Sequence, residues 1–165
     1  MSLKEAGVVG WIPFLAGNLG ALTCAAISDR LVLRYKNPAR ARLALLIGIS
    51  CFGPLACLVP HASSMPLVLG LLSVVAIVCI GWFAVLGPLV TDLFPVGNSA
   101  SVWAIAGAFG AVGAMISNYA IGRVSSALGT EKMFLVLGLL HLAALAVLLF
   151  FVKTDRYVRD SAQET

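Results

Sequence analysis

The chain has 165 residues, of which 61% are hydrophobic and only 11% are charged, with a net charge of +4 and a mean hydropathy of +1.02. A soluble domain of this length does not need so much apolar surface, so the composition excludes an ordinary globular protein and indicates an integral membrane protein. The small positive charge does not predict nucleic-acid binding, because in a membrane protein the positions of the basic residues matter more than their sum. We expect the lipid bilayer as a partner and no nucleic acid.

Uncharged stretches predict the membrane spans. Residues 6–28 carry no charged side chain, which as a helix gives about 34 Å, enough to cross a bilayer core. The uncharged stretch 43–91 is too long for one helix, and "VPHASSMP" (59–66) divides it because its prolines and serines favour a turn. The predicted fold is all-α, a single membrane domain over 1–165. Its five transmembrane helices are expected at about 6–28, 43–60, 66–91, 99–122 and 133–152.

Small residues predict which helices pack against protein, because they let helix backbones approach closely in lipid. In the fourth span, 13 of the 22 residues from Ser99 to Ala120 are Gly, Ala or Ser, so we expect this helix to be sandwiched between others. The first span has a milder stripe of Gly17, Ala21 and Ala25 and should also lie inside a bundle. The fifth span is rich in leucine, which suits the outside.

Two prolines lie inside predicted helices, Pro54 in the second span and Pro88 in the third. Each removes a backbone hydrogen bond, so we expect a kink or a loosened turn near both. Either proline could provide a hinge or only bend its helix.

The distribution of basic residues predicts the orientation. With five spans, one side of the membrane carries 8 Lys and Arg residues, in the loop 29–42 and in the tail, and the other side carries 3. By the positive-inside rule the richer side is cytoplasmic. We therefore expect a multi-pass protein of the cell (inner) membrane, with its N-terminus outside and its C-terminus in the cytoplasm.

Three residues within the spans are candidates for lining a substrate cavity: Asn18, Trp82 and Asn118. An amide at the depth of Asn18 must find a partner or face water, so a hydrogen bond between helices and a contact with a ligand are both open. The same alternatives hold for Asn118, where solvation near the helix end competes as well. Trp82 is deeper than Trp103, whose position suits the membrane interface. His141 has no acidic neighbour in its helix, which favours a packed, neutral side chain over a proton relay.

Membrane-embedded catalysis is disfavoured. An intramembrane aspartyl site needs two carboxylates facing each other within helices, whereas Asp29 and Asp92 lie at predicted helix ends. The sequence has no metal-ligand spacing, no phosphate-binding glycine loop and no nucleotide motif. We expect no enzyme, no cofactor and no metal.

The stretch "SDRLVLR" (28–34) follows a run of small residues and resembles the second-half copy of the cytoplasmic loop motif of the major facilitator superfamily. The resemblance implies that Asp29, Arg30 and Arg34 belong to a cytoplasmic gate. "GWIPFLAGNLGALTCAAISDRL" (10–31), "TDLFP" (91–95) and "ASVWAIAGAFGAVGAM" (100–115) are similar to segments of the anion:cation symporter branch, which adds Asp92 to the gate motif. That branch contains carriers of hexuronates and related sugar acids, so the resemblance implies symport of a small organic anion with a proton or sodium.

The chain departs from that family in two ways. Val96 and Gly97 replace a basic pair, which weakens the positive charge of that loop. Family transporters resemble two six-helix halves, and the five spans here match only helices eight to twelve. We therefore expect the C-terminal portion of a transporter, working with a missing N-terminal half; the alternative is a non-transporting five-helix assembly subunit with a partner membrane subunit, or a gene remnant.

Overall fold

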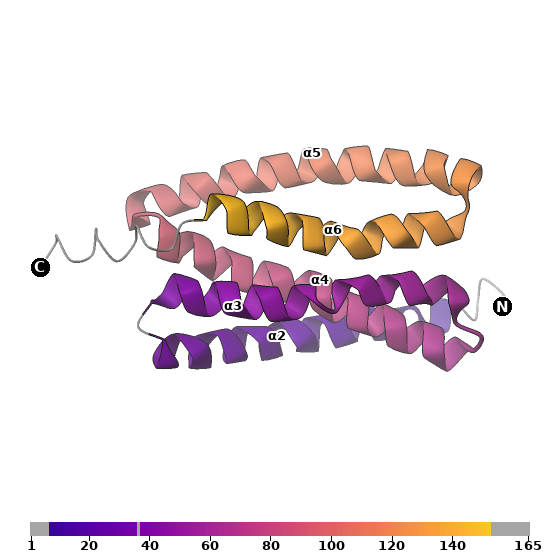
Figure 1. The fold of residues 1–165 in the computed structure, drawn as a ribbon, viewed down its shortest axis with the longest axis horizontal. Coiled ribbons are helices and arrows are strands. Elements are labelled where there is room, and N and C mark those ends of the chain that lie inside the picture. Colours follow the sequence, from indigo (N-terminus) through magenta and orange to yellow (C-terminus); the bar gives the residue numbers. More distant parts are fainter. Residues whose placement is uncertain (1–6, 36, 153–165) are drawn as a thin grey trace, which may run out of the picture.

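Five long helical spans run up and down through the molecule in a computed structural model that describes residues 7–35 and 37–152 (Figure 1). The elements are α2 (Trp11–Arg34), α3 (Pro38–Ser50), the 3-10 helix η1 (Gly53–His61), α4 (Met65–Leu93), α5 (Val96–Leu128) and α6 (Thr130–Phe151). α3 and η1 together form one span, Pro38–His61, and every span is long and apolar enough to cross a membrane. The prediction of an all-α membrane fold with five spans is confirmed.

The helices extend beyond the uncharged stretches that predicted them. α2 continues through Asp29 and Arg30 to Arg34, because a helix keeps its hydrogen bonds after it leaves the hydrocarbon and its charged side chains then reach water. The second span begins at Pro38, ahead of the predicted start. Asn37 caps it by accepting a hydrogen bond from the Arg40 backbone N–H at 3.2 Å, and the proline occupies the first turn.

α2 and α4 pack with their backbones unusually close. The buried face of α2 consists of Gly17, Gly20, Cys24 and Ser28. A Cβ atom at Gly20 would lie 2.6–2.9 Å from three side-chain atoms of Ile77, so only glycine fits there. Of the predicted stripe, Gly17 is buried as expected, whereas Ala21 and Ala25 are only partly buried. The contact face is rotated toward Gly20 because α4 approaches from that side.

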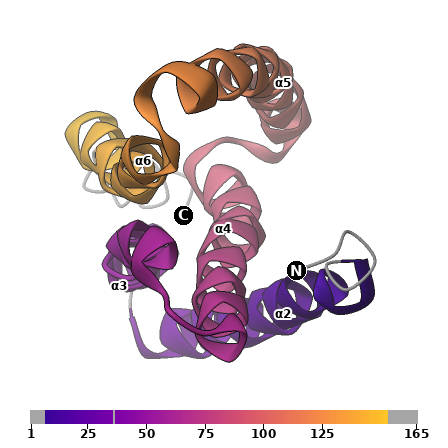
Figure 2. The ribbon, with the colours of Figure 1, turned by 90° about the vertical axis from the view of Figure 1, so that its right-hand side faces the viewer.

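The second span divides its packing between two neighbours. α3 packs against α4 and α2, and its Leu46 is fully buried with Val85 and Leu89 of α4. η1 packs chiefly against α6, where a Cβ atom at Gly138 would lie 2.7 Å from Cys57 Sγ. Figure 2 shows α2, α3 and α4 gathered in one part of the molecule, with α5 and α6 in another.

The sandwiched position expected for the fourth span is wrong within this chain. Among the described residues, the main neighbours of α5 are α4 and α6, each of which it contacts sparsely, and α5 lies at the edge of the molecule (Figure 2). Its Gly107, Gly110 and Gly113 have open space where a Cβ atom would lie. The physical reason is that the chain offers α5 the side of only two helices, so most of its small-residue surface has no neighbour among the described residues.

The expectation about the prolines is confirmed at Pro54, and at Pro88 it stays a prediction. α3 ends at Ser50, whose carbonyl has no N–H partner at Pro54, and the chain continues as η1. α4 instead runs through Pro88 to Leu93 without interruption.

Gly20→Ala should lower the stability of the protein, because the added methyl group must push Ile77 or the whole of α4 away. Gly107→Ala is the matched control, and its expected effect is none or a slight gain, since alanine favours helix by up to about 1 kcal/mol. Thermal unfolding of both variants in lipid nanodiscs measures this. Equal stability of Gly20→Ala and the wild type would contradict the close packing of α2 on α4.

Candidate functional site

Three helix ends meet at Arg42, in the second turn of α3. Its Nε donates a hydrogen bond to Asp92 Oδ2 of α4 at 2.6 Å, and its Nη1 donates to Ser28 Oγ of α2 at 2.7 Å. The same Nη1 lies 3.5 Å from Asp29 Oδ1. We call Ser28, Asp29, Arg42 and Asp92 the ion-pair cluster. One guanidinium thus joins α2, α3 and α4 at the end of the molecule where α2 turns into α3.

The two carboxylates of the cluster lie in different surroundings. The Arg42 side chain is 11% exposed and that of Asp92 is 18% exposed, whereas that of Asp29 is 76% exposed. Water screens an exposed ion pair and leaves a partly buried, short, charge-assisted hydrogen bond much stronger. Arg42 therefore binds Asp92 firmly and Asp29 weakly.

Local sequence explains how the cluster forms. Ser28 is buried because it follows Cys24 by one turn on the face of α2 that contacts α4. The Asn37 cap fixes where α3 begins and so which side of the helix Arg42 occupies. Asp92 lies in the last turn of α4, where the helix dipole is unfavourable for a negative charge. The guanidinium of Arg42 offsets that cost.

The gate motif inferred from the sequence is only partly assembled by the fold. Asp29 and Asp92 come together through Arg42, whereas Arg30 and Arg34 are exposed and make no ion pair within the described ranges. The sequence reasoning missed Arg42 and Ser28 as site residues. A signal was available for Arg42, since it is the last charge before the uncharged stretch 43–91 and two carboxylates are predicted at the same membrane side.

The two candidate asparagines do not contact each other or Trp82. Asn18 is exposed on α2, and its Nδ2 donates to the Phe14 carbonyl of its own helix at 2.8 Å. This satisfies one amide hydrogen within the helix, so the hydrogen bond between helices is not formed in the described part of the chain. Asn118 is exposed on α5. Both amides therefore keep polar atoms available to a neighbour or ligand on the open faces of their helices.

Trp82 lies among α3, α4 and α6 and is partly buried against the core. Its indole N–H donates to Ser50 Oγ at 2.8 Å, and its ring meets that of His141 edge-on at a centroid distance of 6.3 Å. The hydrogen-bonding atom of Trp82 is thus engaged inside the protein.

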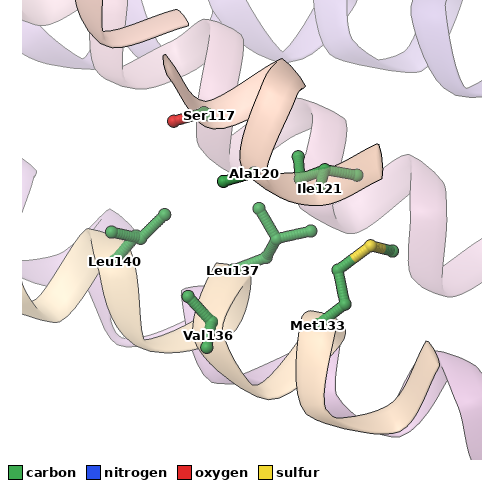
Figure 3. Close-up of a pocket in the computed structure, with 7 residues that line it drawn as sticks. All are labelled: Ser117, Ala120, Ile121, Met133, Val136, Leu137 and Leu140. Carbon is green, nitrogen blue, oxygen red and sulfur yellow. The ribbon is translucent and has the colours of Figure 1, made fainter. Parts of the chain in front are cut away.

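A small apolar pocket of about 160 Å³ lies between α5 and α6 (Figure 3). Its lining consists of Ser117, Ala120, Ile121, Met133, Val136, Leu137 and Leu140. Ser117 provides the one hydroxyl in this lining, and the lining includes none of the three predicted cavity residues. The pocket is too apolar to recognise a charged substrate by itself.

The whole chain, residues 1–165, matches the family model of the Major Facilitator Superfamily. The chain belongs to the major facilitator superfamily. No curated protein and no solved structure gives a match. Membership in the major facilitator superfamily identifies the chain as a membrane transport protein and not an enzyme. The match does not distinguish branches of the superfamily.

Arg42→Gln should lower the free energy of unfolding by about 2 kcal/mol, because charge-assisted hydrogen bonds to Ser28 and Asp92 are lost and a half-buried carboxylate is left without its cation. Arg30→Gln, which removes an exposed charge on α2, should change it by less than about 0.5 kcal/mol. Unfolding in mixed detergent micelles measures both.

A double-mutant cycle then compares the coupling free energies of Arg42 with the two carboxylates, Asp92 and Asp29. The coupling of Arg42 to Asp92 should exceed that of Arg42 to Asp29, since the first pair is largely shielded from water. Equal couplings would contradict the ranking.

Proposed function

We propose that this chain is part of a transporter that carries a small organic anion, a hexuronate or related sugar acid, across the membrane in symport with a proton or sodium. Membership of the superfamily supports the proposal of membrane transport. The proposal of an organic anion and of a coupling ion rests on the resemblance of "SDRLVLR", "TDLFP" and the glycine-rich fourth span to the anion:cation symporter branch.

The observation that carries the proposal furthest is the ion-pair cluster. Arg42 joins the ends of α2, α3 and α4 through hydrogen bonds and an ion pair. A displacement of a side chain by about 1 Å would lengthen these hydrogen bonds beyond their usual range and break them. Such contacts can be made in one conformation and broken in another, which is what a gate at one end of a transporter requires. The 8 basic residues on this side favour a gate at the cytoplasmic end, with the N-terminus outside.

The binding site for the anion is not complete in the described residues. The basic residues of the described part lie at helix ends and none lies at mid-depth of a span. A carboxylate substrate in low dielectric needs a cation or several donors. We infer that another membrane segment, an N-terminal half or a partner subunit, supplies the main charge, and that Asn18 and Asn118 are supporting contacts.

The open face of α5 is consistent with contact with such a partner segment. Its small residues are exposed along most of the helix, and in a bilayer such a surface suits contact with another helix better than contact with lipid tails. The same surface also fits the alternative that the chain is an assembly subunit without transport of its own.

The decisive experiment uses the protein purified from its native membrane with whatever chain accompanies it, reconstituted in liposomes. Radiolabelled glucuronate should accumulate under an imposed proton or sodium gradient, while an uncharged hexose should not. Collapse of the gradient should abolish accumulation. Failure of every sugar acid under both gradients, with the partner chain present, would favour the assembly subunit.

Asp29→Asn should lower the turnover number about twofold with little change in protein stability. The exposed Asp29 adds little to the folded state but contacts Arg42 on one side of the gate, and an exposed ion pair of about 0.5 kcal/mol corresponds to a population shift of about that factor. Glu131→Gln, which neutralises an exposed carboxylate in the first turn of α6, is the control and should leave turnover unchanged. Normal turnover in Asp29→Asn would reduce this residue to a surface charge.

Asn18→Ala should raise the apparent KM with unchanged expression, because the exposed amide would lose its contact with the substrate. Thr23→Ala is a close control: Thr23 is also exposed on α2 and donates to the carbonyl four residues earlier, at 2.8 Å. If both variants keep the wild-type KM, Asn18 does not line the binding site.

A further inference from the structure

The second membrane span changes its helix type halfway through the molecule. α3 ends at Ser50, and η1 continues as a 3-10 helix of nine residues. Its start is marked by hydrogen bonds between residues three apart, from Phe52 N to Ile49 O at 3.0 Å and from Leu55 N to Phe52 O at 3.1 Å. Runs of 3-10 helix longer than three or four residues are uncommon, and inside a helix they often mark a hinge.

Pro54 explains the position of the change. It has no N–H to donate to the Ser50 carbonyl, and its ring would clash with that carbonyl in a continuous α-helix. Within the junction, residues 50–53, Cys51 still donates to the Ile47 carbonyl at 3.3 Å, but Phe52 donates to Ile49 and the Ser50 carbonyl has no N–H partner at Pro54. The regular hydrogen bonds that stiffen an α-helix therefore end there.

The two halves on either side of the junction differ in their main neighbours. α3 packs chiefly against α4 and α2, whereas η1 packs chiefly against α6 and to a lesser extent against α4. At the junction itself, Gly53 is buried, and a Cβ atom there would lie 3.0 Å from His141 Cβ of α6. A change of angle at the junction would thus move α6 relative to α4 without breaking a helix.

A hydrogen bond from α4 holds the end of α3 at this junction. Ser50 is fully buried, accepts from the Trp82 indole N–H at 2.8 Å and donates its own hydroxyl to the Leu46 carbonyl at 2.7 Å. The Trp82 ring also meets that of His141 of α6 edge-on. Trp82 therefore contacts both α3 and α6.

The opposite end of α3 is held by the ion-pair cluster. Arg42, Leu46 and Ser50 follow one another at four-residue spacing and so lie on one face of α3. The face is polar at both ends, where it binds Asp92 and Trp82, and apolar between them. α3 is thereby fixed to α4 at two points and moves with it.

We propose that residues 50–53 form a mid-membrane hinge, about which η1 and α6 tilt against α2, α3 and α4, and that the Trp82–Ser50 hydrogen bond anchors the α3 side of this hinge to α4. This goes beyond the proposed function and does not depend on which substrate is carried.

Backbone hydrogen exchange of the full chain in lipid nanodiscs tests the hinge directly, without a transport assay. Trp82→Phe keeps an aromatic ring and removes the donor, so exchange in the peptide covering residues 50–61 should become about fivefold faster, as expected for one lost hydrogen bond. Trp103→Phe is the control, because Trp103 makes no such hydrogen bond among the described residues. Ser50→Ala combined with Trp82→Phe should add nothing further.

Pro54→Ala supplies the opposite change. It restores the N–H that the Ser50 carbonyl lacks, so residues 50–61 should exchange more slowly than in the wild type while residues 38–49 stay unchanged. Wild-type exchange in Trp82→Phe, an equal increase in Trp103→Phe, or no slowing in Pro54→Ala would each overturn the hinge.

Discussion

The close approach of α2 and α4 is the constraint on which the rest of the structure depends. It requires glycine at position 20 of α2, where a Cβ atom would overlap three side-chain atoms of Ile77, and it places Gly17 of α2 and Gly81 of α4 close to side chains of the other helix. Because the helices are this close, the same face of α2 brings Ser28 within hydrogen-bonding distance of Arg42. A separation larger by one methyl group would remove Ser28 from the cluster and weaken the link of three helix ends.

Several side-chain hydrogen bonds in this molecule join different helices. Along α3, the ion pair of Arg42 with Asp92 and the hydrogen bond of Ser50 with Trp82 bracket a dry layer of Leu46, Val85 and Leu89. In low dielectric such contacts are strong when made and costly when left unpaired, so they stabilise discrete arrangements of helices. This property suits a protein that must exchange between conformations, and it distinguishes α3 from the loosely attached α5.

The sequence predicted the spans well because charge and hydropathy act locally and the bilayer imposes a fixed length. It predicted the candidate site only in part. Asp29 and Asp92 were placed at the same end by counting spans, but Arg42, their common partner, lies 50 residues from Asp92 in the chain. The linear pattern marks Arg42 as the last charge before the uncharged stretch 43–91, but it does not say that the side chain of Arg42 turns inward. The prediction that α5 is sandwiched between helices failed for a related reason. Small residues allow another helix to approach closely, but they do not show that such a helix is present.

By itself, the sequence determined that this is a membrane protein, that it has five spans long enough to cross the bilayer, and that the second span has a kink or a loosened turn near Pro54, because each of these follows from hydrocarbon thickness or from a missing N–H group. Only the tertiary structure decided that Arg42 joins two carboxylates, that Trp82 donates to Ser50, and that α3 packs chiefly against α4 whereas η1 packs chiefly against α6. These depend on the rotation of each helix about its axis, which is set by the fit of side chains between helices.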